Sequence, residues 1–173
     1  MRFIKIFSFV FACLLLGSSC KTQQVTPEQA AEHQEALLAL RNGCFIVQLD
    51  ALYPSSASPL TPALTEYKEM RESYLKANGG DFSYYISPND GMRLHIGFPA
   101  DRKENLRAEV SEGKKKRNGE CRFHIKVRGE GIVDDRDVVI LLRPHSNRCT
   151  VKVTQPGRVS QISMEGRVFP LKE

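Results

Sequence analysis

Apolar and polar residues alternate along most of the chain beyond residue 80, a pattern typical of strands with one buried face. In the clearest segment, 121–128, four apolar residues alternate with Arg122, His124, Lys126 and Arg128. Similar segments occur at 44–53, 82–87, 92–98, 106–111, 137–142, 149–153 and 159–169. About eight strands, with turns every eight to twelve residues, predict a mainly β fold, either a small antiparallel β-sandwich or a partly closed barrel.

Two other segments have helical signatures. Thr26-Pro27-Glu28-Gln29 is a capping box with proline at the first helical position, and Ala-, Glu- and Leu-rich sequence follows as far as Asn42-Gly43. This predicts a helix that serves as a tether. Residues 62–77 predict a second helix, ended by Asn78-Gly79-Gly80, and its narrow apolar stripe places it on the domain surface.

The N-terminus has the plan of a signal peptide. Arg2 and Lys5 precede an apolar run over 6–17, which is shorter than the roughly 20 residues of a membrane-spanning helix. The run ends in Leu16-Gly17-Ser18-Ser19-Cys20, which is similar to the lipobox of bacterial lipoproteins and predicts acylation of Cys20. An ordinary signal peptide with a chance cysteine is the alternative.

Cleavage before Cys20 divides the chain into a signal peptide (1–19), a lipidated N-terminus with a helical tether (20–43) and an antiparallel β domain (44–173). The residues after the cysteine, Lys21-Thr22-Gln23-Gln24, carry no acidic cluster. By resemblance to lipoprotein sorting signals, we expect a lipid anchor in the outer membrane facing the periplasm. The membrane is therefore the first expected partner.

Composition and cysteines narrow the chemistry. Losing Arg2 and Lys5 with the signal lowers the formal charge from +5 to +3, too mild a charge to predict nucleic-acid binding. Of the cysteines that remain, Cys121 and Cys149 fall on apolar strand faces, with the predicted strand 137–142 between them. Two strand spacings exceed the reach of a disulfide, so we expect buried, unpaired thiols. The sequence contains no Cys-x-x-Cys or His-x-x-x-His spacing that would predict a metal site, and we expect no cofactor.

The C-terminal half resembles a known family. Asn118-Gly119, a strand, Gly129-x-Gly131-Ile132, a Val/Ile-rich strand, Pro144-x-Ser146-Asn147, a Val-x-Val strand and Gly166-x-Val168-x-Pro170 follow one another as in uncharacterised bacterial lipoproteins labelled domain of unknown function 4251. The lipobox, the Ala/Glu-rich helix and the strand Phe45-Ile46-Val47-Gln48-Leu49-Asp50 also resemble that family. The resemblance implies a compact β fold and no established activity, so it supplies no catalytic residue.

The basic row Arg122, His124, Lys126 and Arg128 is the candidate site. Cations on one open sheet face could hold an anionic glycan or a lipid head group, although a solvated face is the plainer interpretation. Lys114–Arg117 is likewise either a wet hairpin tip or a contact for anionic lipid. Asp134-Asp135-x-Asp137 lacks the glycine and distal glutamate of a calcium loop and is interpreted as a turn.

No nucleophile with a base and no Gly-x-Ser-x-Gly elbow is present, so we predict no catalytic residues and a protein that is not an enzyme. The leading hypothesis is a cell-envelope lipoprotein whose β domain binds a ligand or a partner protein of the envelope. One alternative is a hydrolase of envelope glycans using His95 or His124. Another is a purely structural role in the envelope.

Overall fold

A computed structural model describes residues 25–53, 68–69, 72–86, 102–130, 135–154 and 161–171 of the chain. The signal peptide, the lipobox with Cys20, and the predicted strand 92–98 with His95 lie outside these residues. Within the described part, no helix has both the length and the apolarity required to span a bilayer. The elements are one helix, α2 (Pro27–Asn42), and the strands β1 (Cys44–Tyr53), β2 (Lys68–Glu69), β3 (Tyr74–Asn78), β4 (Asp81–Tyr85), β5 (Arg102–Glu112), β6 (Cys121–Arg128), β7 (Arg136–Leu142), β8 (Arg148–Thr154) and β9 (Gln161–Pro170).

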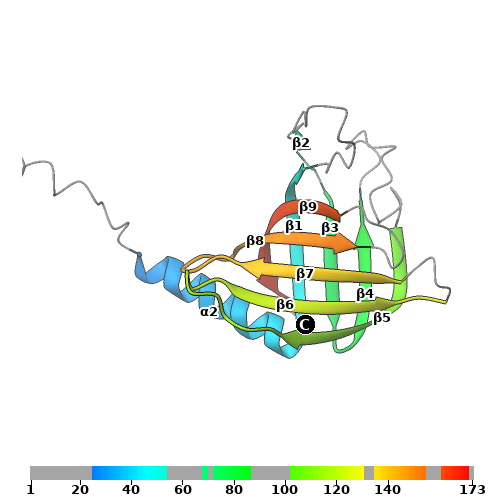
Figure 1. Cartoon of the computed structure of the whole chain (residues 1–173), viewed down its shortest axis with the longest axis horizontal. Coiled ribbons are helices and arrows are strands. Elements are labelled where there is room, and N and C mark those ends of the chain that lie inside the picture. The colour runs from blue at the N-terminus through cyan, green and yellow to red at the C-terminus, as the bar shows by residue number, and fades with distance from the viewer. Residues whose placement is uncertain are drawn as a thin grey trace, which may run out of the picture.

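The strands form one antiparallel sheet that closes on itself (Figure 1). Neighbouring strands run in the order β1-β3-β4-β5-β6-β7-β8-β9, and β9 pairs in turn with β1, so eight strands make a closed barrel. The two-residue β2 is attached outside this circle, beside the end of β1. The mainly β, antiparallel prediction is confirmed, and of its two alternatives the barrel is the one observed.

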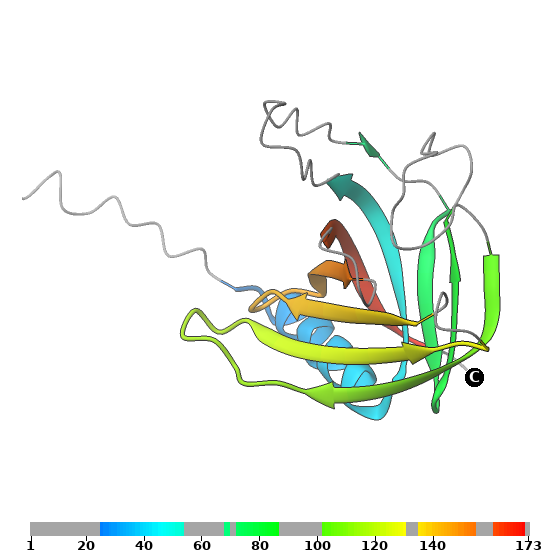
Figure 2. The same cartoon turned by 45° about the vertical axis from the view of Figure 1, so that its right-hand side comes forward.

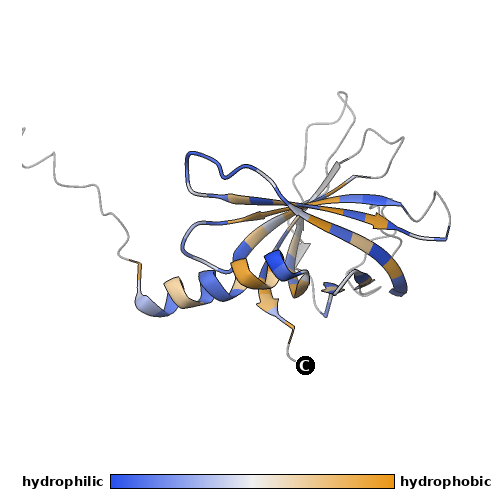
Figure 3. Ribbon diagram, turned by 90° about the horizontal axis from the view of Figure 1, so that it is seen from below, coloured by the Kyte–Doolittle hydropathy of each residue, from blue (hydrophilic) through white to orange (hydrophobic). Residues whose placement is uncertain are grey.

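The alternation read from the sequence is the alternation between the inside and the outside of the barrel. On β6 the burial runs strictly in and out, with Phe123, Ile125 and Val127 almost completely buried. Figure 3 shows the same banding of hydrophilic and hydrophobic residues along other strands. Strands and helix contribute to a single hydrophobic cluster, whose largest fully buried side chains are Phe45, Phe82, Phe123, Leu40, Leu49, Leu75, Ile86, Ile125, Ile140 and Leu142.

The helix predicted over 62–77 is wrong where the structure describes it. Lys68–Glu69 is β2, and Tyr74–Ala77 belongs to β3, where Leu75 and Ala77 are buried between β1 and β4. Hydrogen bonding to strands on both sides overrides the helical propensity of this short segment. Asn78-Gly79-Gly80 is the tight β3–β4 turn instead of a helix end, and both glycines have positive φ.

The seam between β1 and β9 depends on a glycine. Gly166 lies opposite Leu49, beside a bulge that leaves Asp50 unpaired in the register. A Cβ added at Gly166 would come within 2.4 Å of the Gln48 carbonyl oxygen, a backbone atom that cannot turn away. Only glycine permits this close approach of two strands. Next to it, Arg167 donates two hydrogen bonds to the Asp50 carboxylate, at 3.2 and 3.1 Å.

Helix α2 lies across one end of the barrel (Figures 1 and 2). The predicted capping box is present, since Thr26 Oγ1 accepts from Gln29 N and Gln29 Oε1 accepts from Thr26 N, and Gly43 ends the helix in the left-handed conformation. Ala36 and Leu40 are completely buried in the core. At its C-terminal end Arg41 makes a bidentate ion pair with Glu112 of β5, at 2.9 and 3.0 Å. The second half of the helix therefore packs as part of the barrel, while most of the first half is exposed.

The cysteines of the described chain are free thiols. Cys121 and Cys149 are both in register with Leu142, one on either side of β7, as the predicted order of strands requires. Burial raises the pKa of the Cys149 thiol to about 12, so this group stays protonated and unreactive while the barrel is folded.

Candidate functional site

The turn between β7 and β8, residues 143–148, lies beside helix α2. Arg143 N donates to Arg148 O at 2.9 Å and closes the turn, and Ser146 Oγ accepts from Arg148 N at 3.0 Å. His145 has a φ of 56°, a left-handed conformation that histidine adopts more readily than most residues. The sequence Pro-x-Ser-Asn thus folds into a compact, internally bonded turn.

Helix α2 is pinned to this turn through histidine. His33 Nδ1 lies 3.0 Å from the Ser146 carbonyl oxygen, so this nitrogen carries the proton and donates it. The His33 and His145 rings lie near each other, tilted by 45° with their centroids 6.3 Å apart. One turn earlier on the same side of the helix is Gln29, since positions four apart share a helix face.

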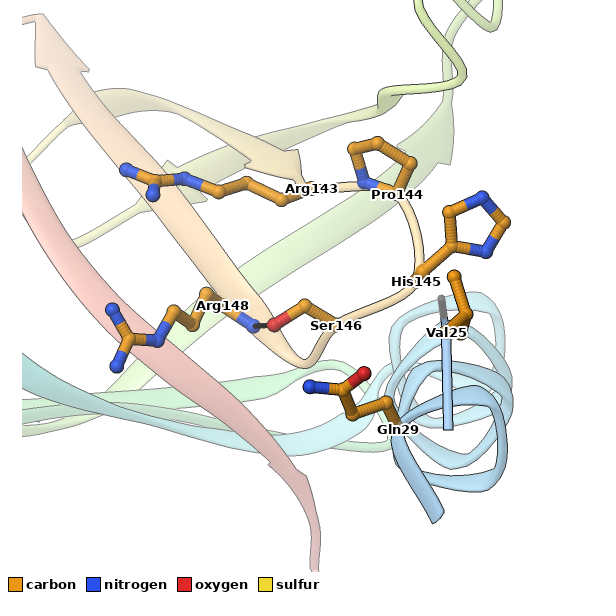
Figure 4. Close-up of a pocket in the computed structure, with 7 residues that line it drawn as sticks. All are labelled: Val25, Gln29, Arg143, Pro144, His145, Ser146 and Arg148. Atoms are coloured by element: carbon orange, nitrogen blue, oxygen red, sulfur yellow. Dashed lines mark hydrogen bonds between the residues drawn. The ribbon is translucent and has the colours of Figure 1, made fainter. Parts of the chain in front are cut away.

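A pocket of about 580 Å³ opens between the helix and the turn (Figure 4). Figure 4 shows Arg143 and Arg148 leaving the hairpin on the same side, with both guanidinium groups pointing the same way. Gln29 enters from the helix below them. The residues that line the pocket are Val25, Gln29, Arg143, Pro144, His145, Ser146 and Arg148.

The lining of this pocket is rich in hydrogen-bond donors. It contains two arginines and no carboxylate. The side-chain oxygens of Gln29 and Ser146 already accept bonds from Thr26 N and Arg148 N, which leaves the amide N–H groups and the hydroxyl proton to donate. A ligand that satisfies these groups must be an acceptor, and the two guanidinium groups favour a negative charge on it.

The two arginines differ in their partners. Arg143 donates to Glu165 of β9 at 2.5 Å, so its charge is already partly balanced. The guanidinium of Arg148 has neither a hydrogen bond nor an ion pair among the residues that the structure describes. Its β9 neighbour in the register is Arg167, which is paired with Asp50. Arg148 is therefore the cation of this site that has most to gain from an anion.

The predicted basic row lies elsewhere, on the outer face of β6. Lys126 stands in register between Glu109 of β5 and Asp137 of β7, and Arg128 pairs with Asp135 at 3.4 Å. The buried Nε of Arg122 has no hydrogen-bond partner. The structure lines the four residues up as predicted, but carboxylates lie beside Lys126 and Arg128, and the row is on a different strand from the pocket.

His124, one of the two histidines proposed for a glycan hydrolase, is exposed on this face. Its register partners are Ser111 and Val139, and Ser111 Oγ donates to the His124 backbone carbonyl rather than to the ring. In the acidic cluster, Asp135 accepts from Gly129 N and pairs with Arg128, as in an ordinary turn. No group of three potential metal-ligand side chains comes together in the described part of the chain.

Reasoning from sequence missed the arginine pair. Arg143 and Arg148 flank the turn Pro144-x-Ser146-Asn147, which is recognisable in the sequence. Because they are five residues apart, they lie directly opposite each other on the two arms of the hairpin. The spacing of the two arginines could thus be read from the sequence, but the pocket also needs helix α2 as its second wall. That contact joins residues more than one hundred positions apart.

The fold and the pocket together define a class: an eight-stranded antiparallel barrel with an N-terminal helix across one end and a cationic pocket at the helix–turn junction. Among solved structures, the chain is similar to the crystal structure of a DUF4251 family protein from Bacteroides eggerthii DSM 20697. The match has a TM-score of 0.59 and 12% sequence identity, and it covers 82% of this chain and 89% of that one. The family resemblance read from the C-terminal motifs is thus confirmed at the level of the fold.

Neither comparison of sequences adds to this. No protein-family model matches the chain. No curated protein matches it.

Proposed function

We propose that the protein is a cell-envelope lipoprotein, anchored through Cys20 in the outer membrane facing the periplasm, that binds an anionic ligand and catalyses no reaction. The anchor rests on the lipobox and the apolar run before it. Binding rests on one observation: in a pocket lined by donors, the Arg148 guanidinium beside Arg143 has no partner among the described residues.

The pocket has the properties that recognition needs. Arginine presents a planar fork of donors that matches carboxylate and phosphate oxygens, and a partly enclosed site strengthens such charge-assisted bonds. Two bonded turns of the chain, the hairpin 143–148 and the start of α2, fix the backbone from which these donors extend before any ligand arrives. A preformed site of this kind favours binding over a purely structural role.

Binding is tested with the mature protein in detergent, titrated with inorganic phosphate and, separately, with a uronic-acid oligosaccharide. Arg148→Gln keeps the length and polarity of the side chain but removes its charge. We expect affinity for at least one probe to fall by about tenfold or more. Arg107→Gln removes an exposed arginine that is paired with Asp81 at 2.7 Å on another strand, and affinity should not change. Equal affinities in all three proteins would refute the site.

The anchor is tested on its own. Mass spectrometry of the N-terminal peptide from envelope-derived protein should show Cys20 as the first residue, carrying acyl chains, and Cys20→Ser should abolish this mass. An unmodified Cys20 peptide in purified envelopes would remove the lipoprotein half of the proposal and leave the pocket unaffected.

A further inference from the structure

We propose that the anion held by the Arg143–Arg148 pocket is the phosphate of a phospholipid headgroup in the membrane that carries the anchor. The helix-covered end of the barrel then docks on the bilayer surface. This inference rests on the proposed function and names the ligand class of the same site. Three independent observations support it: the length of the tether, a basic loop next to the pocket, and the chemistry of the pocket rim.

The first observation is the distance from the anchor. Val25 lines the pocket and stands only five residues after Cys20. A chain spans at most about 3.6 Å per residue, so whatever path residues 21–24 take, Val25 lies within about 18 Å of the lipid-bearing residue. The polar layer of one leaflet is about 6 Å thick. In an acylated chain the pocket is therefore tethered within reach of the headgroups.

The second observation is a basic loop beside the pocket. Residues 113–120 connect β5 to β6 at the same end of the barrel, and a Cβ built on Gly119 would lie 3.3 Å from Pro144 Cβ of the β7–β8 turn. The loop is hydrophilic in Figure 3, and Lys114, Lys115 and Arg117 are exposed. Lys116 alone in this run is paired, with Glu120. Each cation near an anionic membrane surface contributes about 1 kcal/mol.

The third observation is the chemistry of the rim. Val25, which is 40% exposed, and Pro144 add apolar surface to a pocket whose other lining residues carry guanidinium, amide and hydroxyl donors. A phospholipid presents a phosphate diester next to its glycerol and acyl carbons. A small hydrophilic anion would match the donors but leave these apolar residues in water.

Acidic residues on the helix set the orientation of the docked domain. Glu28, Glu32 and Glu35 are spaced four and three residues apart and form one exposed stripe. Gln29 and His33, which face the turn, belong to a different stripe of the helix. Like charges repel an anionic surface, so the acidic stripe turns toward water, and the pocket and the basic loop turn toward the bilayer.

The test measures amide hydrogen exchange in residues 113–120 and 143–148 of the mature acylated protein. One sample is reconstituted in vesicles of phosphatidylethanolamine and phosphatidylglycerol, the other is held in a nonionic detergent without phosphate. We expect several-fold slower exchange of both segments in the vesicles. Arg148→Gln should lose the protection of 143–148, whereas Arg107→Gln should keep it.

A parallel titration of the detergent sample with sn-glycerol 3-phosphate separates the two proposals. Protection by free glycerol phosphate without protection in vesicles overturns membrane docking and leaves the anion pocket standing. Protection in neither sample overturns the phospholipid assignment, and the uronic-acid titration described above then decides on its own whether the anion pocket stands. Protection in vesicles that persists in Arg148→Gln overturns the role assigned to the pocket, because the loop or the anchor alone then accounts for docking.

Discussion

The basic row of β6 and the arginine pair of the β7–β8 turn both face outward on the same barrel. On β6 the cations alternate with inward core residues, and the flanking strands place Glu109, Asp135 and Asp137 beside them. At the turn, Arg143 pairs with Glu165, whereas the Arg148 guanidinium has no ion pair among the described residues. Alternation along a strand therefore tells which way a charge points, whereas the neighbouring strands decide whether that charge is free to bind.

Charge reversal should separate the two regions most strongly. Arg148→Glu places a negative charge in a donor-lined pocket, and we expect affinity for a phosphate probe to fall by more than about tenfold. Lys126→Glu on the row should change it by less than about threefold, because an exposed charge outside the pocket acts only through screened, long-range attraction. Isothermal titration of both variants measures the difference. A larger loss from Lys126→Glu would move the binding site to β6.

Histidines give the next largest effect. His33→Ala removes the bond to the Ser146 carbonyl and leaves that acceptor unsatisfied, which costs about 1 kcal/mol and lowers the melting temperature by about 2–4 °C. His124→Ala removes an exposed ring from the row and should leave the melting temperature within about 1 °C of wild type. Thermal unfolding followed by circular dichroism compares the two. Equal melting temperatures for the two variants would show that the His33 hydrogen bond does not hold the helix against the turn.

The smallest expected effect concerns pH. The hydrogen bond and charge of Arg41 hold the pKa of Glu112 below its usual value, so their stabilisation is present above the pKa of the unfolded chain and lost as the pH falls through the folded pKa. The Glu112 and Arg41 side chains are 39% and 47% exposed, so screening by water keeps this contribution to stability small.

Glu112→Gln should therefore be slightly less stable than wild type at neutral pH and equal to it in acid. Glu109→Gln is the matched control, because Glu109 lies on the same strand as Glu112 but has no ion pair among the described residues, and it should show no such convergence. Urea unfolding across this pH range measures both variants. A gap between Glu112→Gln and wild type that widens in acid would contradict the sign of the pKa shift.

Most of the barrel was predictable because the side-chain pattern within each strand indicates that strand without information from the rest of the chain. Segments such as 121–128 and 137–142 alternate or are continuously apolar, and the structure finds them as β6 and β7 in the expected order. Sandwich and barrel could not be distinguished, since the side-chain pattern of a strand is the same in both. The difference is the pairing of β1 with β9, which no local pattern records.

The failures have a common physical cause. Tyr74–Asn78 has only five residues and includes Leu, Lys and Ala, which favour helices, so pairing with two other strands had to decide its conformation. The candidate site was misplaced for a similar reason. The pocket exists only where the first turn of α2 meets the β7–β8 hairpin. The carboxylates beside Lys126 and Arg128 likewise come from other segments, namely β5, β7 and the residue before β7.

Closure of the barrel through β1 and β9 also constrains how the chain can be made. During synthesis β1 is made more than one hundred residues before its partner at 161–170, and until that partner appears β1 and β8 present unpaired backbone edges. Long-range pairing of this kind is slow and exposes such edges to other chains. A chain stalled on the ribosome before β9 would expose an open sheet that can pair with other chains. The barrel closes only when β9, with Gly166, pairs with β1.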